Sequence, residues 1–222
     1  MGTAAPSIRA AMKALPLLTL CAMSLCGCKV LTIDENRAFL ARQNNEINAA
    51  SYVNEIWSSK ATPLFQSKAV PARTLFPEIE ADLAKAGAKW GRKTGEGSAW
   101  TFVVAGEGQV KAIDAISRRG TATVNLANTG QQNIVTLQIG PVVAGTAIRD
   151  ALPFVSFNDF PGQLAFADVG RELTTKAFTS LKPALARLRV DQRIRFVGVL
   201  NLREAEGQAV ITPISITPIA DL

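Results

Sequence analysis

From residue 100 onward, hydrophobic positions recur mainly with a period of two, which is typical of half-buried β-strands. The clearest case is Ala122, Val124 and Leu126, which are apolar and alternate with polar residues. The pattern predicts five strands, at 108–116, 121–126, 135–139, 194–202 and 210–216. In the first of these the apolar phase slips between Val110 and Ile113, which predicts a β-bulge or a sharp coil.

Between the third and fourth predicted strands the period changes to that of a helix. Apolar residues recur there at intervals of three or four, at Phe166, Val169, Leu173, Ala177 and Leu181. Three strands, a helix and two strands follow the order of the five-stranded OB barrel, whose opening strand is long and bent. We therefore predict an α+β fold with an OB-like Greek-key barrel over residues 100–222. The same pattern also allows an open antiparallel sheet with helices on one face.

Residues 47–99, before the barrel, are predicted to form a helical region. Ile47, Ala50, Val53 and Trp57 share one helical face, and Pro63 is expected to end or bend this helix. A second helix is predicted over 77–88, with Pro77 in its first turn and Gly87 as the residue after its end. Residues 89–99 contain three glycines and no periodicity, which predicts a loop.

The start of the chain has the features of a signal peptide. Arg9 and Lys13 make it positive, and the mostly apolar run of twelve residues that follows is shorter than the ~20 needed to span a bilayer. The run ends in Leu25-Cys26-Gly27-Cys28, which resembles the lipobox of bacterial lipoproteins. We predict cleavage before Cys28 and lipidation of its thiol. Cleavage before Cys26 is disfavoured because the large Leu25 would then occupy the position before the cut.

This N-terminal pattern predicts a signal peptide over 1–27 and a lipidated, polar tether over 28–46, carrying a protein anchored in the periplasm. Attachment through the three acyl chains that the resemblance implies would be stable. The alternative is a soluble exported protein whose cysteines are incidental. All three cysteines lie at or before position 28, which excludes a disulfide scaffold. Both the inner and the outer membrane remain alternatives for the membrane that holds the lipid anchor.

Removal of residues 1–27 lowers the formal charge from +6 to +4, so the mature chain is mildly basic. Its longest basic cluster is Lys89, Arg92 and Lys93, with only Trp90 nearby. Nucleic-acid footprints concentrate charge and interleave aromatic residues. We interpret the cluster as a solvated loop and expect no nucleic-acid partner.

The catalytic chemistry available to the chain is limited. It contains no histidine, so the usual general base and the commonest zinc ligand are missing, and no metal or cofactor is expected. Gly140–Gly145 has the glycine spacing of a phosphate loop, but Thr146 and Ala147 stand where a lysine and a hydroxyl belong. Asp150 with Asp159 is the carboxylate pair that could support glycoside hydrolysis.

The segment from Gly140 to Gln163 is far longer than the ~4 to 6 residues of an ordinary connection. Its apolar residues are expected to bury it; they are Ile148, Leu152, Phe154, Val155, Phe157 and Phe160. Thr146 is a candidate cap for a short helical turn. The candidate site residues are the polar ones between them, Arg149, Asp150, Asn158, Asp159 and Gln163.

Two interpretations of these polar residues stay open. In the structural one, Arg149 pairs with Asp150 or Asp159, while Asn158 and Gln163 hydrogen-bond to the backbone. In the functional one, the same side chains line a pocket and orient a small ligand.

Several short motifs are spread over the mature chain: Cys28–Val30, Ile56-Trp57, the Gly106-x-Gly108-x-Val110 pattern, Gln138–Pro141, Gly145–Ala151, Phe157–Phe160 with Gln163, and Ile211–Pro213. On these motifs the whole mature chain resembles a family of predicted bacterial periplasmic lipoproteins of unknown function. The resemblance implies no catalytic residues. Some members are encoded beside sugar ABC importers, so it implies an accessory role in solute uptake, with importer components as partners.

These observations favour a non-enzymatic binding or accessory module that is held on a membrane through lipid on Cys28. The alternatives are a carboxylate-dependent hydrolase and a purely structural envelope lipoprotein.

Overall fold

The computed structural model describes residues 32, 48–127, 129, 133–205 and 208–219. The chain divides into two units, 1–43 and 44–222, and the description below concerns the second. The signal peptide, Cys28, the rest of the tether except Thr32, and Ile47 lie outside the described residues. Within those residues, no helix has both the length and the apolar character needed to cross a membrane.

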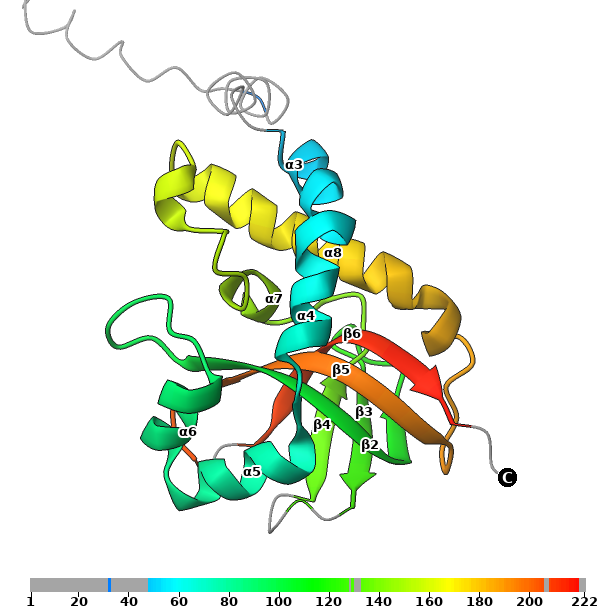
Figure 1. Ribbon diagram of the computed structural model, residues 1–222. Helices are drawn as coiled ribbons and strands as arrows, with labels where there is room; N and C mark the ends of the chain where they lie inside the picture. Colours follow the sequence, from blue (N-terminus) through cyan, green and yellow to red (C-terminus); the bar gives the residue numbers. More distant parts are fainter. Residues whose placement is uncertain (1–31, 33–47, 128, 130–132, 206–207, 220–222) are drawn as a thin grey trace, which may run out of the picture. The chain divides into compact units, whose positions relative to one another are not determined.

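All five predicted strands are present, and the sheet closes on itself (Figure 1). The first begins at Trp100 instead of Gly108, because Thr101–Val104 are all buried and apolar and polar positions do not alternate there. The strands are β2 (Trp100–Asp114), β3 (Thr121–Leu126), β4 (Ile134–Gln138), β5 (Arg193–Leu202) and β6 (Val210–Pro218), with a two-residue β1 (Val70–Pro71) beside β2. Their order is β1-β2-β3-β4-β6-β5, and β2 also pairs with β5. The helix α8 (Gln163–Leu185) connects β4 to β5, as predicted. The pairing of β2 with β5 closes the sheet, so the prediction of an OB-like barrel is confirmed and the alternative of an open sheet is wrong.

The long strand β2 belongs to both halves of the barrel. Its first part, Trp100–Gln109, pairs with β5, and its second part pairs with β3. The predicted irregularity is confirmed as a register shift between Val110 and Ala112. A Cβ on Gly108 would lie 2.3 Å from the carbonyl oxygen of Asn125, so glycine permits the close approach of β2 and β3 at this bend.

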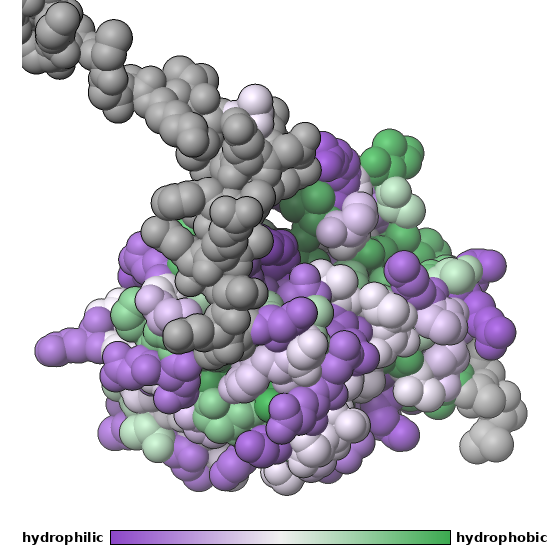
Figure 2. Space-filling model, turned by 90° about the horizontal axis from the view of Figure 1, so that it is seen from above, coloured by the Kyte–Doolittle hydropathy of each residue, from purple (hydrophilic) through white to green (hydrophobic). Residues whose placement is uncertain are grey.

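The apolar side chains form two clusters. The first fills the barrel interior and includes Phe102, Phe196 and Leu137, with Phe76 and Ile79 covering one end. The second lies outside the barrel wall, where helices pack over Val103 and Val199. Seen from above, most of the surface is hydrophilic or of intermediate hydropathy, and hydrophobic residues gather mainly toward one side (Figure 2).

The first helical run is longer than predicted. It comprises α3 (Ala49–Ile56), the π-helical turn η3 (Trp57–Ala61) and α4 (Thr62–Lys68). Pro63 does not end it: the proline falls in the first turn of α4, directly after the π-helical turn. The run begins at Asn48, whose Oδ1 accepts a hydrogen bond from the backbone N–H of Ser51 at 3.0 Å.

The predicted bounds of the second helix are wrong at both ends. The chain forms α5 (Ala72–Ala81) and α6 (Leu83–Trp90), so the helix starts five residues before Pro77. The break falls at Asp82, whose side chain accepts a hydrogen bond from the Lys85 N–H at 3.0 Å and caps α6. Gly87 does not follow the helix but lies buried inside it. A Cβ there would lie 2.3 Å from the Trp100 ring, so Gly87 is a packing position rather than a cap.

Candidate functional site

The long connection after β4 is mostly packed against the helices. It contains the short helix α7 (Ala147–Asp150) and the 3₁₀ turn η4 (Phe157–Asp159), and it leads into α8. Ile148, Leu152 and Val155 are buried, as predicted. Phe157 was expected to be buried too, but 48% of it is exposed. The interior therefore holds most of the segment and leaves this aromatic ring at the surface.

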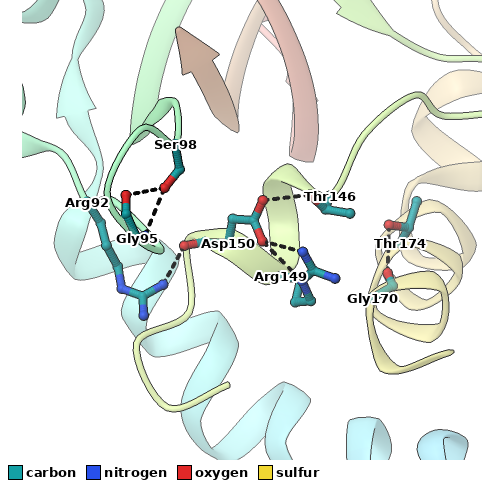
Figure 3. Close-up of polar contacts among 8 residues, drawn as sticks. All are labelled: Arg92, Gly95, Ser98, Thr146, Arg149, Asp150, Gly170 and Thr174. Atoms are coloured by element: carbon teal, nitrogen blue, oxygen red, sulfur yellow. Dashed lines mark hydrogen bonds and ion pairs between the residues drawn. The ribbon is translucent and has the colours of Figure 1, made fainter. Parts of the chain in front are cut away.

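Arg149 and Asp150 form an ion pair at the end of α7 (Figure 3). Nε and Nη2 of Arg149 lie 3.0 and 2.8 Å from Oδ1 of Asp150, and the two side chains are only 15% and 14% exposed. The second carboxylate oxygen accepts a hydrogen bond from the Thr146 hydroxyl at 2.6 Å. Thr146 precedes α7 as predicted, but its hydroxyl binds this carboxylate instead of capping the backbone. Of the two partners considered for Arg149, the structure has Asp150.

The Arg149 side chain also packs on α8. Its guanidinium carbon lies 3.9 Å from the centroid of the Phe166 ring, within the range of a cation–π interaction. A Cβ on Gly170 would lie 3.3 Å from Cδ of Arg149, so the bare backbone of α8 at this position leaves room for the arginine. Arg149 thus joins α7 to α8.

Arg92 also belongs to this site, although no sequence pattern indicated it. Its Nη1 donates a hydrogen bond to the carbonyl oxygen of Asp150 at 2.6 Å. The other members of its basic cluster have other contacts: Lys89 pairs with Glu78 at 2.8 Å, and Nζ of Lys93 lies 4.5 Å from the Trp100 ring centroid. No local pattern could have revealed the Arg92 contact, because it joins positions 58 residues apart.

The remaining candidate residues separate into two groups. Asp159 accepts a hydrogen bond from the Ser156 backbone N–H at 3.0 Å and stabilises η4. Asn158 and Gln163 are exposed, and the hydrogen bonds to the backbone that we expected for them are not found in the described parts of the chain. Their amide groups are therefore available to other molecules.

A hollow of about 740 Å³ opens between α7, η4 and the start of α8, and we call it the α7–α8 cleft. It is lined by Arg92, Thr94, Arg149, Asp150, Val155, Ser156, Phe157, Asn158, Gln163, Leu164, Phe166 and Ala167. Four of the five candidate residues thus lie around one hollow, and Asp159 does not. Contacts run across it from Arg92 through Asp150 and Arg149 to Phe166, and on to Phe157, whose ring meets that of Phe166 edge-on at 5.6 Å.

Tyr52 joins the first turns of α3 to the same connection. Its ring meets Phe160 edge-on, with 5.5 Å between the ring centroids. Burial raises the pKa of the Tyr52 phenol, and the negative charges of Asp159 and Glu55 raise that pKa further. The segment around the cleft is therefore held from two sides, by α3 and by α8.

A second hollow, of about 670 Å³, lies where β2, β3 and β5 meet α5. Arg73, Arg193 and Arg195 line it, and Arg195 pairs with Glu107 across the β2–β5 ladder. None of the candidate residues reaches this hollow, which makes its exposed arginines suitable controls.

The carboxylate pair proposed for hydrolysis is not free in the way a general acid and base require. Asp150 is bound by Arg149 and Thr146, and Asp159 by backbone. Within the described residues, no group of three or more aspartate, glutamate, cysteine or histidine side chains is placed to hold a metal ion.

Comparison with known proteins gives a family and a fold. The model of a family described as "Predicted periplasmic lipoprotein (DUF2291)" matches residues 18–218. An OB-fold protein from Thermotoga maritima has a similar structure, with a TM-score of 0.64 and 16% identity over 78% of this chain and 99% of that one. An OBody bound to hen egg-white lysozyme aligns with a TM-score of only 0.31, at 14% identity over 56% of this chain and 83% of that one. No curated protein matches the chain.

Proposed function

The chain belongs to the family of predicted periplasmic lipoproteins, DUF2291. We propose that it binds a small solute in the α7–α8 cleft without transforming it. Membrane anchoring brings such a module close to the proteins that move solutes across the envelope. The OB-like barrel would serve as the rigid support, and the long β4–α8 connection as the binding element.

One observation carries the proposal. Arg149, Asp150, Asn158 and Gln163 come from one connection, Arg92 comes from another, and all five line the same hollow beside exposed apolar side chains. Small-molecule sites combine a few polar groups with apolar walls in this way. The amides of Asn158 and Gln163 support a binding role in particular, because they have no hydrogen-bond partner among the described residues.

The interactions of the two carboxylates, Asp150 and Asp159, favour a binding function over hydrolysis. Hydrolysis by a carboxylate pair requires one group as acid and the other as base or nucleophile around a shared substrate. Asp150 is held in an ion pair, and Asp159 supports a turn outside the cleft. The chain also contains no histidine that could replace them.

The proposal is tested with the mature protein in a thermal-shift screen against sugars, carboxylic acids, organic phosphates and amphiphiles. A ligand at one hundred times its Kd stabilises a protein by about 2.7 kcal/mol, which such a screen detects. The doubly substituted variant Asn158→Ala, Gln163→Ala is expected to fold normally and to lose the shift, since both side chains are exposed and unbonded.

Gln66→Ala is the matched control, because Gln66 is an exposed amide on α4 away from the cleft. A shift that survives the double substitution would place binding elsewhere. Turnover of a glycoside or ester that Asp150→Asn abolishes without unfolding would instead support the hydrolase.

We further propose that the protein acts as an accessory of a sugar ABC importer. The support is the family resemblance, because some members are encoded beside such importers. Cross-linking from a photoreactive residue at position 157 in intact cells tests it. Capture of a solute-binding protein or permease is expected, whereas cross-links to peptidoglycan alone would favour a structural envelope role.

A further inference from the structure

The charges around the α7–α8 cleft do not balance. Three charged side chains line it, and two of them, Arg149 and Asp150, neutralise each other in their ion pair. Arg92 has no acidic partner among the described residues. The cleft therefore keeps one uncompensated positive charge.

The guanidinium of Arg92 has unused donors. Its one hydrogen bond goes from Nη1 to the Asp150 carbonyl, and Figure 3 shows a second guanidinium nitrogen with no partner among the residues drawn. Arginine carries five N–H donors in a planar fork that matches a carboxylate or a phosphate. A half-buried fork of this kind is completed most favourably by an anion, because anions form charge-assisted hydrogen bonds with it.

The lining of the cleft also includes exposed apolar side chains. Phe157, in the connection, is 48% exposed, and Leu164, in the first turn of α8, is 54% exposed. Phe157 rests against Phe166, which is covered on another side by the Arg149 guanidinium. Exposed apolar side chains at the rim of a hollow mark a place where a ligand buries its own apolar surface.

From this arrangement we infer that the cleft takes an amphiphilic anion, with a carboxylate or phosphate group at Arg92 and an apolar body along Phe157 and Leu164. This inference rests on the proposed binding function and names the class of ligand. The exposed amides of Asn158 and Gln163 lie along the same hollow and would hydrogen-bond the polar part of the ligand.

A matched pair of fluorescent probes tests the inference on the mature protein. 1-Anilinonaphthalene-8-sulfonate carries an anionic group, and N-phenyl-1-naphthylamine has the same rings without it. The wild type is expected to bind the sulfonate at least tenfold more tightly than the neutral probe. Arg92→Gln should lower the affinity for the sulfonate about tenfold and leave the neutral probe unchanged, since a tenfold change corresponds to one charge-assisted contact.

Phe157→Ser should weaken the binding of both probes, because it removes an apolar side chain from the lining of the cleft. Arg193→Gln, an exposed arginine of the second hollow, is the control and should change neither. Melting temperatures check that each variant is folded, and Arg92→Lys should recover part of the sulfonate affinity. Sulfonate binding that is the same in the wild type and in Arg92→Gln overturns the inference. If Phe157→Ser also leaves both probes unaffected, the cleft is not a binding site and the proposed function fails as well.

Displacement of the sulfonate distinguishes a soluble ligand from a lipid headgroup. Octyl phosphate that displaces the probe where octanol does not indicates a soluble amphiphile. Displacement only by vesicles containing phosphatidylglycerol, and not by phosphatidylcholine vesicles, indicates a membrane lipid. Both results support the amphiphilic anion, and displacement by octanol as readily as by octyl phosphate contradicts it.

Discussion

Arg149 and Asp150 are neighbours in the sequence and bind each other through side chains that are only 15% and 14% exposed. Adjacent residues of a regular helix point about 100° apart and do not face each other, and this pair forms at the last two residues of the short helix α7. The pair leaves its carboxylate joined to Thr146 and its guanidinium joined to Phe166. The ion pair therefore links the two ends of α7 to each other and α7 to α8.

Replacement of one member of this pair should destabilise the protein strongly. Arg149→Met keeps much of the apolar stem but leaves Asp150 without its counter-ion, and breaking a buried pair costs about 3 to 5 kcal/mol. Urea unfolding measures the change. Arg171→Met is the control, because Arg171 pairs with Asp168 at the surface of α8, with the two side chains 67% and 33% exposed, and should lose only about 0 to 1 kcal/mol.

The double variant Arg149→Met, Asp150→Asn should regain part of the loss, because it no longer buries an unpaired charge. Equal unfolding midpoints for wild type and Arg149→Met would show that the pair contributes nothing to the fold.

Gly87→Ala should lower stability, although the same change in an ordinary helix raises it by about 1 kcal/mol. The added Cβ would lie 2.3 Å from the Trp100 ring, and overpacking of this kind costs about 1 to 3 kcal/mol. Thermal unfolding followed by circular dichroism measures it. The smaller ring in the variant Gly87→Ala, Trp100→Phe should recover part of the loss, and a single variant more stable than wild type would contradict the packing at this position.

The chain contains a single tyrosine, so its absorbance on alkaline titration reports Tyr52 alone. The midpoint should lie above the ordinary tyrosine pKa of 10.0, mainly because of burial. Asp159→Asn should lower the midpoint only part of the way toward 10.0, since the charge of Asp159 is the second cause of the raised pKa, after burial. Asp168→Asn should leave it unchanged.

The raised pKa of Tyr52 also predicts how stability varies with pH. The folded state favours the neutral phenol, so its contribution is fully present below pH 10.0 and is lost as the pH rises through the folded-state pKa. Tyr52→Phe should remove this part of the alkaline loss. If the stability of wild type and Tyr52→Phe varies in the same way at alkaline pH, Tyr52 does not contribute to the alkaline loss of stability.

Lipidation at Cys28 is a prediction from the sequence, and metabolic labelling tests it. Radiolabelled palmitate should enter the wild type and Cys26→Ser but not Cys28→Ser. Label that remains in Cys28→Ser would show that another residue carries the lipid.

Much of the barrel could be predicted because strands such as β3 and β4 are buried on one face, so that apolar and polar residues alternate along them. The phase slip near Val110 even located the bulge. The bounds of the helices before the barrel were harder to predict, because tertiary packing outweighs the local sequence signals for helix ends. Gly87 has the sequence context of a helix end, yet it was selected by its contact with Trp100, thirteen residues further along the chain.

The candidate site also contains residues that the sequence predicts and residues that only the structure reveals. The polar residues between α7 and α8 stood out because they interrupt an apolar segment, and four of them meet at one hollow. Arg92 could not be found from the sequence, since its contact with Asp150 depends on how a distant loop folds back. Phe157 was expected inside because aromatic residues usually are, and only the structure shows its ring at the rim.

The pairing of β2 with β5 also determines when the protein can fold. Trp100 lies opposite Leu202, so about a hundred residues of chain must be present before the first barrel strand has its partner, and such distant contacts close slowly. The parallel seam of β4 with β6 adds a further delay, because it needs Val210 and Ile211, close to the end of the sequence. In a chain exported from its N-terminal end, β2 emerges long before β5 and β6. We expect its open strand edges to be prone to aggregation until the barrel closes.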